Sequence, residues 1–138
     1  MLDRRSLVGV LFLFACAKPF AAPVSSSTAA PPDQTFQCAM KQMDALGYKR
    51  SSYDTDELRV NGSKIDPNAH RADTQFRRVL NKLEVDVGPQ PDGKTSLQVV
   101  GHTFAEYTTQ RGPTEVEEKA SEQVRSDTQQ LLKRCASS

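Results

Sequence analysis

Three cysteines constrain the fold more than any other feature of this chain of 138 residues. Cys16 ends an apolar run near the N-terminus, whereas Cys38 and Cys135 lie almost one hundred residues apart and enclose most of the remaining sequence. If these two lie on helices that pack antiparallel on a sheet, their sulfurs meet, and a disulfide that closes so long a loop stabilises by about 4.7 kcal/mol in the entropic model. The alternative is a redox-active or metal-binding pair, which the absence of a Cys-x-x-Cys spacing disfavours.

The N-terminus has the layout of a secretory signal peptide over residues 1–15. Arg4 and Arg5 precede the apolar run Leu7–Ala15, and small residues follow it. The run has nine residues, whereas a helix that spans a membrane needs about 20. A short apolar stretch with a basic flank is typical of an export signal, and the paired arginines leave the twin-arginine route open. Export would place the folded part in an oxidising compartment, where a disulfide between the other two cysteines persists.

The end of this segment, Leu13-Phe14-Ala15-Cys16, resembles the lipobox of bacterial lipoproteins. In that family the cysteine sulfur is lipidated and the cysteine becomes the first residue. The resemblance therefore implies lipidation at Cys16 and a membrane as the partner of the anchor. Cleavage after Ala17 is the alternative, because Ala15-Cys16-Ala17 is itself a small-x-small site, and it would give a soluble secreted or periplasmic protein.

Residues 16–34 are rich in proline, serine and alanine and show no apolar periodicity. This composition predicts a disordered, partly extended linker. The part from Lys18 to Thr35 reaches roughly 55 Å if it is fully extended as polyproline II. We expect the linker to hold a single folded domain, residues 35–136, clear of a membrane surface.

Helical periodicity marks both ends of this domain. Over Phe36–Leu46, apolar residues recur on one helix face, and Gly47 is placed to end the helix. A second helix is predicted to open at Pro113 and Thr114, because Thr114 and Glu117 have the spacing of a capping box. Its apolar stripe consists of Val116, Ala120, Val124, Leu131 and Cys135.

Four strands are predicted between the helices. Asn61-Gly62 predicts either a hairpin turn or a bulge in a longer strand, and Gly101 predicts a bulge or bend. Residues 69–83 fit helical and strand spacing alike, and a strand is favoured because alternation continues to Val87. The strands are expected over Tyr48–Tyr53, from Glu57 onward, over Arg77–Val87 and over Thr95–Thr108.

These elements predict an α+β fold of two layers. We expect an antiparallel four-stranded meander covered on one face by the N-terminal and C-terminal helices, in the order α-β-β-β-β-α.

Composition and motifs narrow the function. The chain has 18 Lys and Arg against 17 Asp and Glu, and no Trp, which disfavours nucleic-acid binding. His70 and His102 lack further ligands at metal-site spacing, and no nucleophile or phosphate-loop motif is present, so we predict no enzyme, no metal and no cofactor.

The acidic runs Asp54–Glu57 and Glu115–Glu118 are interpreted as a turn and a helix start. A basic cluster is interpreted as a solvated strand face, with anionic headgroups or a polyanion as the alternative; it consists of Arg71, Arg77, Arg78 and Lys82.

The stretch Leu46-Gly47-Tyr48 at the end of the first helix, followed by a meander and a cysteine-tipped last helix, resembles small exported bacterial domains of unknown function. The layout is similar, more loosely, to the helix-grip domains of outer-membrane assembly lipoproteins. The resemblance implies a non-enzymatic lipoprotein of the cell envelope that serves as a binding or scaffolding module, with a possible envelope protein partner. The alternatives are a secreted binder of a small apolar ligand and an uncharacterised enzyme.

Overall fold

The structure is a computed structural model, and it describes residues 20–21 and 23–136. The predicted signal peptide and Cys16 lie outside the described residues. In chain order the elements are β1 (Val24–Thr28), α1 (Pro32–Ala45), β2 (Lys49–Asp54), β3 (Arg59–Asp66), β4 (Phe76–Pro89), β5 (Thr95–Thr109), β6 (Gly112–Glu118) and α2 (Glu122–Ala136).

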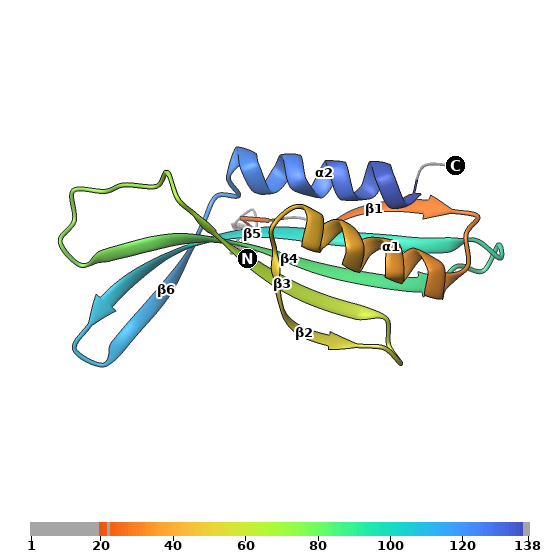
Figure 1. The fold of residues 1–138 in the computed structure, drawn as a ribbon, viewed down its shortest axis with the longest axis horizontal. Coiled ribbons are helices and arrows are strands. Elements are labelled where there is room, and N and C mark those ends of the chain that lie inside the picture. Colours follow the sequence, from red (N-terminus) through yellow and green to blue (C-terminus); the bar gives the residue numbers. More distant parts are fainter. Residues whose placement is uncertain (1–19, 22, 137–138) are drawn as a thin grey trace, which may run out of the picture.

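The fold is α+β in two layers, with both helices on one side of a sheet (Figure 1). The sheet is antiparallel and six-stranded, in the order β1-β5-β4-β3-β2, and β6 also pairs with β5. β1 pairs with Thr95–Val99 of β5, and β6 pairs with Thr103–Thr109. These two short strands therefore lie one after the other along the same side of β5, the longest strand. The core between the layers is filled by large side chains that are almost fully buried, including Phe36, Met43, Leu83, Leu97 and Leu131.

The predicted class and layers are confirmed, but the four-stranded meander is wrong. Val24–Thr28 was expected within the linker and instead forms β1, with Val24 opposite Val99 and Thr28 opposite Thr95. The strand has no apolar alternation of its own, and its place is fixed by pairing with β5. Helix α1 accordingly begins at Pro32 rather than Phe36, since proline suits the first turn of a helix.

The start of the last helix is also corrected. Residues Gly112–Glu118 form β6 along β5 instead of a first helical turn, so the Thr114–Glu117 capping box does not form. The helix begins later, at Glu122, and the hydroxyl of Ser121 accepts a hydrogen bond from the Val124 amide at 3.2 Å. Pairing with a long neighbouring strand outweighs a local capping signal here.

The ambiguous stretch 69–83 is resolved as a loop followed by β4, so the strand prediction is confirmed for its second half. The Asn61-Gly62 pair lies inside β3, and the irregularity in pairing falls in β2, between Arg50 and Ser52. No bulge occurs at Gly101, which pairs in register with Leu83.

Gly101 is instead the point of closest approach between α2 and the sheet. A Cβ added there would lie 2.9 Å from the Oγ1 of Thr128 and 3.0 Å from a Cγ2 of Val124. Only glycine therefore lets α2 lie this close to β5.

Candidate functional site: a groove between β1 and α2

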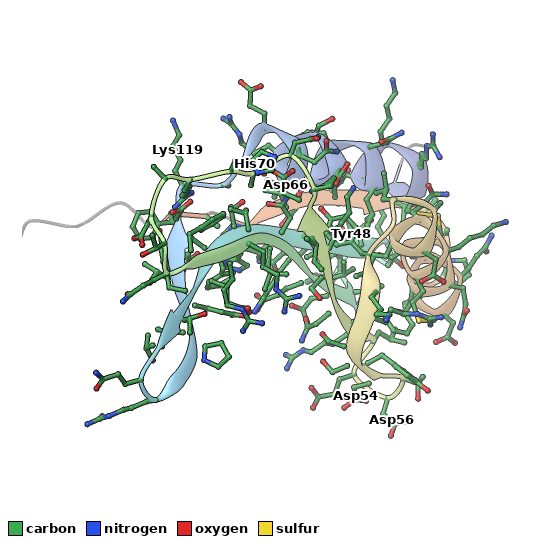
Figure 2. The ribbon with its side chains drawn as sticks, turned by 60° about the vertical axis from the view of Figure 1, so that its left-hand side comes forward. Tyr48, Asp54, Asp56, Asp66, His70 and Lys119 are labelled. Atoms are coloured by element: carbon green, nitrogen blue, oxygen red, sulfur yellow. A yellow bond between two sulfur atoms is a disulfide. The ribbon has the colours of Figure 1, made fainter. Side chains whose placement is uncertain are left out.

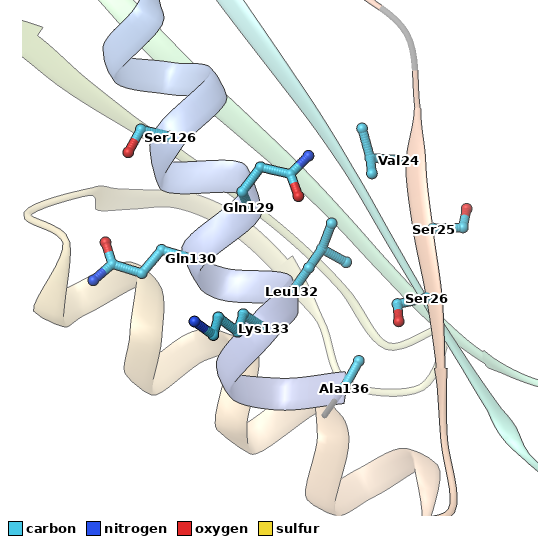
Figure 3. A pocket seen from close by; sticks show the side chains of 9 residues that line it. All are labelled: Val24, Ser25, Ser26, Ser126, Gln129, Gln130, Leu132, Lys133 and Ala136. Carbon is cyan, nitrogen blue, oxygen red and sulfur yellow. The ribbon is translucent and has the colours of Figure 1, made fainter. Parts of the chain in front are cut away.

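An open groove of about 760 Å³ lies between β1 and α2, and we call it the β1–α2 groove (Figure 3). Its strand side carries a valine and two serines, and its helix side is mostly amide, hydroxyl and small apolar groups. Lys133 is the one charged residue among those that line it. The lining consists of Val24, Ser25, Ser26, Ser126, Gln129, Gln130, Leu132, Lys133 and Ala136.

Among the described residues β1 pairs with β5 alone, which makes it an edge strand of the sheet. On an edge strand, alternate backbone N–H and C=O groups point away from the sheet and are free to pair with another chain. The sequence of β1, Val-Ser-Ser-Ser-Thr, contains neither a charged residue nor a proline. The groove thus lies directly beside an unprotected sheet edge.

A disulfide between Cys38 and Cys135 fixes the C-terminal end of α2 against α1. The Cα atoms are 5.7 Å apart, a separation that is usual for a disulfide. Cys135 precedes Ala136, which lines the groove, so the bond holds one end of the helical wall in place.

A buried polar cluster fixes the middle of the same helix. The carboxylate of Asp127 accepts hydrogen bonds from the Tyr48 hydroxyl at 2.7 Å and from the Gln123 amide at 2.9 Å, and the Lys64 ammonium lies 3.4 Å away. Burial and, secondly, the hydrogen bond to Asp127 raise the pKa of Tyr48, which keeps its hydroxyl protonated as a donor. Lys64 also donates to the Leu46 carbonyl at 2.8 Å.

This cluster explains the Leu46-Gly47-Tyr48 motif. Gly47 adopts a φ of +89°, which turns the chain out of α1, and Tyr48, directly before β2, then reaches Asp127 of α2. The motif is a structural tie between α1, β3 and α2.

The N-terminal end of α2 is tied to the sheet by a third set of contacts. The fully buried Asn81 accepts hydrogen bonds from Thr103 at 2.8 Å and from Ser121 at 2.9 Å. The helical wall of the groove is therefore held at both ends and in its middle by residues of α1, β3, β4 and β5.

The basic cluster predicted from the sequence is paired with glutamates of β5 and β6. Lys82 lies 2.6 Å from Glu115, and Arg77 and Arg78 lie 3.2 and 3.3 Å from Glu106. Because the two arginines share one carboxylate, these pairs reduce the positive charge of the cluster without cancelling it. The remaining member, Arg71, forms a bidentate pair with Glu118 that lowers the pKa of that carboxyl.

His102 lies between two carboxylates on the sheet face opposite the helices. Its Nδ1 is 2.8 Å from Glu117 and its Nε2 is 3.3 Å from Glu84. His70 lies apart from it, exposed in the loop between β3 and β4 (Figure 2). In the part of the chain that the structure describes, no group of three or more His, Cys, Asp or Glu side chains is placed to hold a metal ion.

The acidic run Asp54–Glu57 forms the predicted turn, in which the Asp54 carboxylate accepts hydrogen bonds from the amides of Asp56 and Glu57. The run Glu115–Glu118 belongs to β6 instead of a helix start. Three of its glutamates pair with residues outside β6. Glu115 pairs with Lys82, Glu117 with His102 and Glu118 with Arg71.

The sequence analysis did not identify the groove. Its two walls come from residues 24–26 and 126–136, which are brought together only when β1 pairs with β5. The one available signal was the β-branched residue at each end of the uncharged run Val24–Thr28.

Within residues 20–21 and 23–136, no helix is long and apolar enough to cross a membrane. A scan against protein-family models finds no match for this chain. A search of curated proteins likewise finds no significant match.

Proposed function

We propose that this protein is an exported, non-enzymatic binding module, anchored to a membrane through a lipid on Cys16, that receives an extended segment of an envelope protein along β1. The observation that carries the proposal is the unprotected edge of β1 beside an open groove. Addition of a strand to a sheet edge is a common way to bind an extended peptide.

The other sheet edges carry features that discourage such pairing. All of β2 is exposed, it includes Lys49, Arg50 and Asp54, and its pairing is irregular after Arg50. β6 contains Pro113 and three glutamates. Charged side chains, proline and bulges are the usual means by which sheet edges avoid a new strand.

The groove supports the chemistry of the expected partner. In an added strand, alternate side chains would point to the helix side of the sheet and enter the groove. Gln129 points toward β1 and offers hydrogen bonds to these side chains, whereas Gln130 and Lys133 point to the other side of α2 (Figure 3). We therefore expect an extended segment that is uncharged.

A groove of about 760 Å³ also favours a partner with larger side chains over a second copy of this chain. A second copy that paired through its own β1 would offer only Val24, Ser26 and Thr28 to the helix side, and these side chains are small.

The alternative of a small apolar ligand has less support. The space between helices and sheet is filled by core side chains. The β1–α2 groove lies within the range of about 300–1,000 Å³ that is usual for ligand pockets, but it is open and lined largely by serine and glutamine. The cavity that shares Val24 and Gln129 with it has about 250 Å³, below that range.

Photo-crosslinking in native envelopes tests the proposal. The photoreactive residue p-benzoylphenylalanine replaces Ser25 or Ser27, and the matched control places it at Ser52 on the β2 edge. Because side chains on one face of a strand recur every second residue, we expect the Ser25 and Ser27 probes to attach to partner residues two positions apart. Ser52 should give no such product.

Two outcomes would overturn the proposal. Attachment sites scattered over the partner would mean that no strand is added at β1. A crosslinked product made of two copies of this chain would mean that β1 serves self-association instead.

A further inference from the structure

We infer that the cavity around Phe20 is the surface on which the domain rests against the lipid bilayer. This cavity, called the Phe20 notch here, is lined by Phe20, Ala21, Val24, Gly101, Ala120, Arg125, Thr128 and Gln129. The inference rests on the proposed lipid anchor at Cys16.

The chain between the anchor and the notch is short. Cys16 and Phe20 are four residues apart, and an extended chain covers at most about 14 Å over that length. The predicted linker ended at residue 34, but Phe20 and Ala21 already line a cavity together with residues of α2 and β5. A lipid on Cys16 would therefore hold the notch within this distance of the headgroups.

The chemistry of the notch suits an interface between water and lipid. The Phe20 side chain is 58% exposed, one of the largest exposures of an apolar side chain among the described residues. Arg125 lines the same notch, and Lys119 is exposed next to Ala120, which also lines it. Aromatic rings insert at the headgroup level, and basic side chains are attracted to anionic lipids. Acidic residues also lie near these cations in sequence. Asp127 is buried and pairs with Tyr48 and Lys64, Glu118 pairs with Arg71, and Glu122 lies one helical turn before Arg125.

Contact between the Phe20 notch and the bilayer, called the seat here, would also determine where the β1–α2 groove lies relative to the membrane. Val24 and Gln129 line both the notch and the groove, and the groove continues along α2 to Ala136. One end of the groove would therefore open at the membrane surface.

Tryptophan fluorescence of the full-length lipidated protein tests the seat, because the chain has no tryptophan of its own. The Phe20→Trp variant is reconstituted in vesicles of phosphatidylethanolamine and phosphatidylglycerol whose acyl chains carry bromine, a contact quencher. The matched control is Tyr53→Trp, which replaces another exposed aromatic residue, 64% exposed, on β2.

We expect brominated chains to remove most of the emission of Phe20→Trp and to leave that of Tyr53→Trp unchanged. Adding Arg125→Glu to Phe20→Trp should reduce the quenching. Equal quenching of the two tryptophans, or none at Phe20→Trp, would overturn the seat.

Mass spectrometry of the same preparation separates the two proposals. A diacylglyceryl group on Cys16 with an unquenched Phe20→Trp would refute the seat and keep the anchor. The absence of that group would refute both.

Discussion

Two of the sheet edges, those at β2 and β1, are built in opposite ways. At one end, β2 is exposed throughout, carries three charged residues and departs from regular pairing. At the other, β1 is uncharged, pairs with β5 in unbroken register and lies beside an open groove. A protein gains solubility when its sheet edges are closed to other strands, and the open edge at β1 agrees with the binding role proposed for it.

The two edges also differ in what holds their surroundings. The helix beside β1 is fixed by the disulfide, by Asp127 and by the Asn81 contacts, whereas β2 is tied to α1 by the solvent-accessible Arg50–Asp44 pair. A rigid wall next to an open edge lowers the entropic cost of binding, because the helix does not have to be ordered when a segment binds.

Loss of the disulfide should lower the stability of the protein most, and it should loosen the β1 side of the molecule more than the β2 side. Cys135→Ser is expected to lower the free energy of unfolding by about 2–5 kcal/mol, because the unfolded chain is no longer crosslinked. Hydrogen exchange should rise in α2 and β1 more than in β2, since Cys135 lies at the end of the groove wall. Chemical denaturation measures the first effect. An unchanged midpoint would show that the disulfide does not carry this stability.

A side chain added at residue 101 should have the next largest effect on stability. Gly101→Val pushes α2 away from β5, because even a Cβ would lie 2.9 Å from Thr128, and overpacking of this kind costs about 1–3 kcal/mol. Gly88→Ala is the control, since nothing lies within 4 Å of a Cβ placed there. Equal thermal midpoints for the two variants would contradict the close packing of α2 on the sheet.

Charge on the open edge should abolish binding with little effect on folding. Ser25→Lys together with Ser27→Lys replaces exposed side chains of β1, so the expected change in stability is within about 0.5 kcal/mol. The crosslinked product formed from a probe on the groove residue Gln129 should nevertheless disappear. Ser52→Lys on β2 is the control and should leave that product intact.

The smallest expected effect concerns β6, the second protected edge. Arg71 lowers the folded-state pKa of Glu118 below the ordinary 4.5, mainly through hydrogen bonding. A carboxyl with a lowered pKa stabilises the fold above its unfolded pKa, and the contribution is lost as the pH falls through the folded-state value. Glu118→Gln should therefore flatten the decline in stability below about pH 4.5, and unfolding midpoints from pH 7 to pH 3 measure this. The same pH profile for the variant and the parent protein would exclude a role for this pair.

The parts of the fold that were predictable from sequence are those with their own periodicity. The apolar stripe of α1 and the alternation through β4 and β5 depend on burial of one face, which the sequence displays directly. β1 and β6 lack such a pattern, and both owe their conformation to hydrogen bonds with β5. The groove was therefore invisible in the sequence, since one of its two walls is β1.

Amide exchange measured by nuclear magnetic resonance tests the central claim most directly. The partner segment identified by crosslinking is synthesised and added to isotope-labelled protein. The account predicts slower exchange for alternate amides of β1, those that face away from β5, and no change in β2. Slower exchange in β2 or elsewhere, with β1 unaltered, would contradict the claim that β1 receives the added strand.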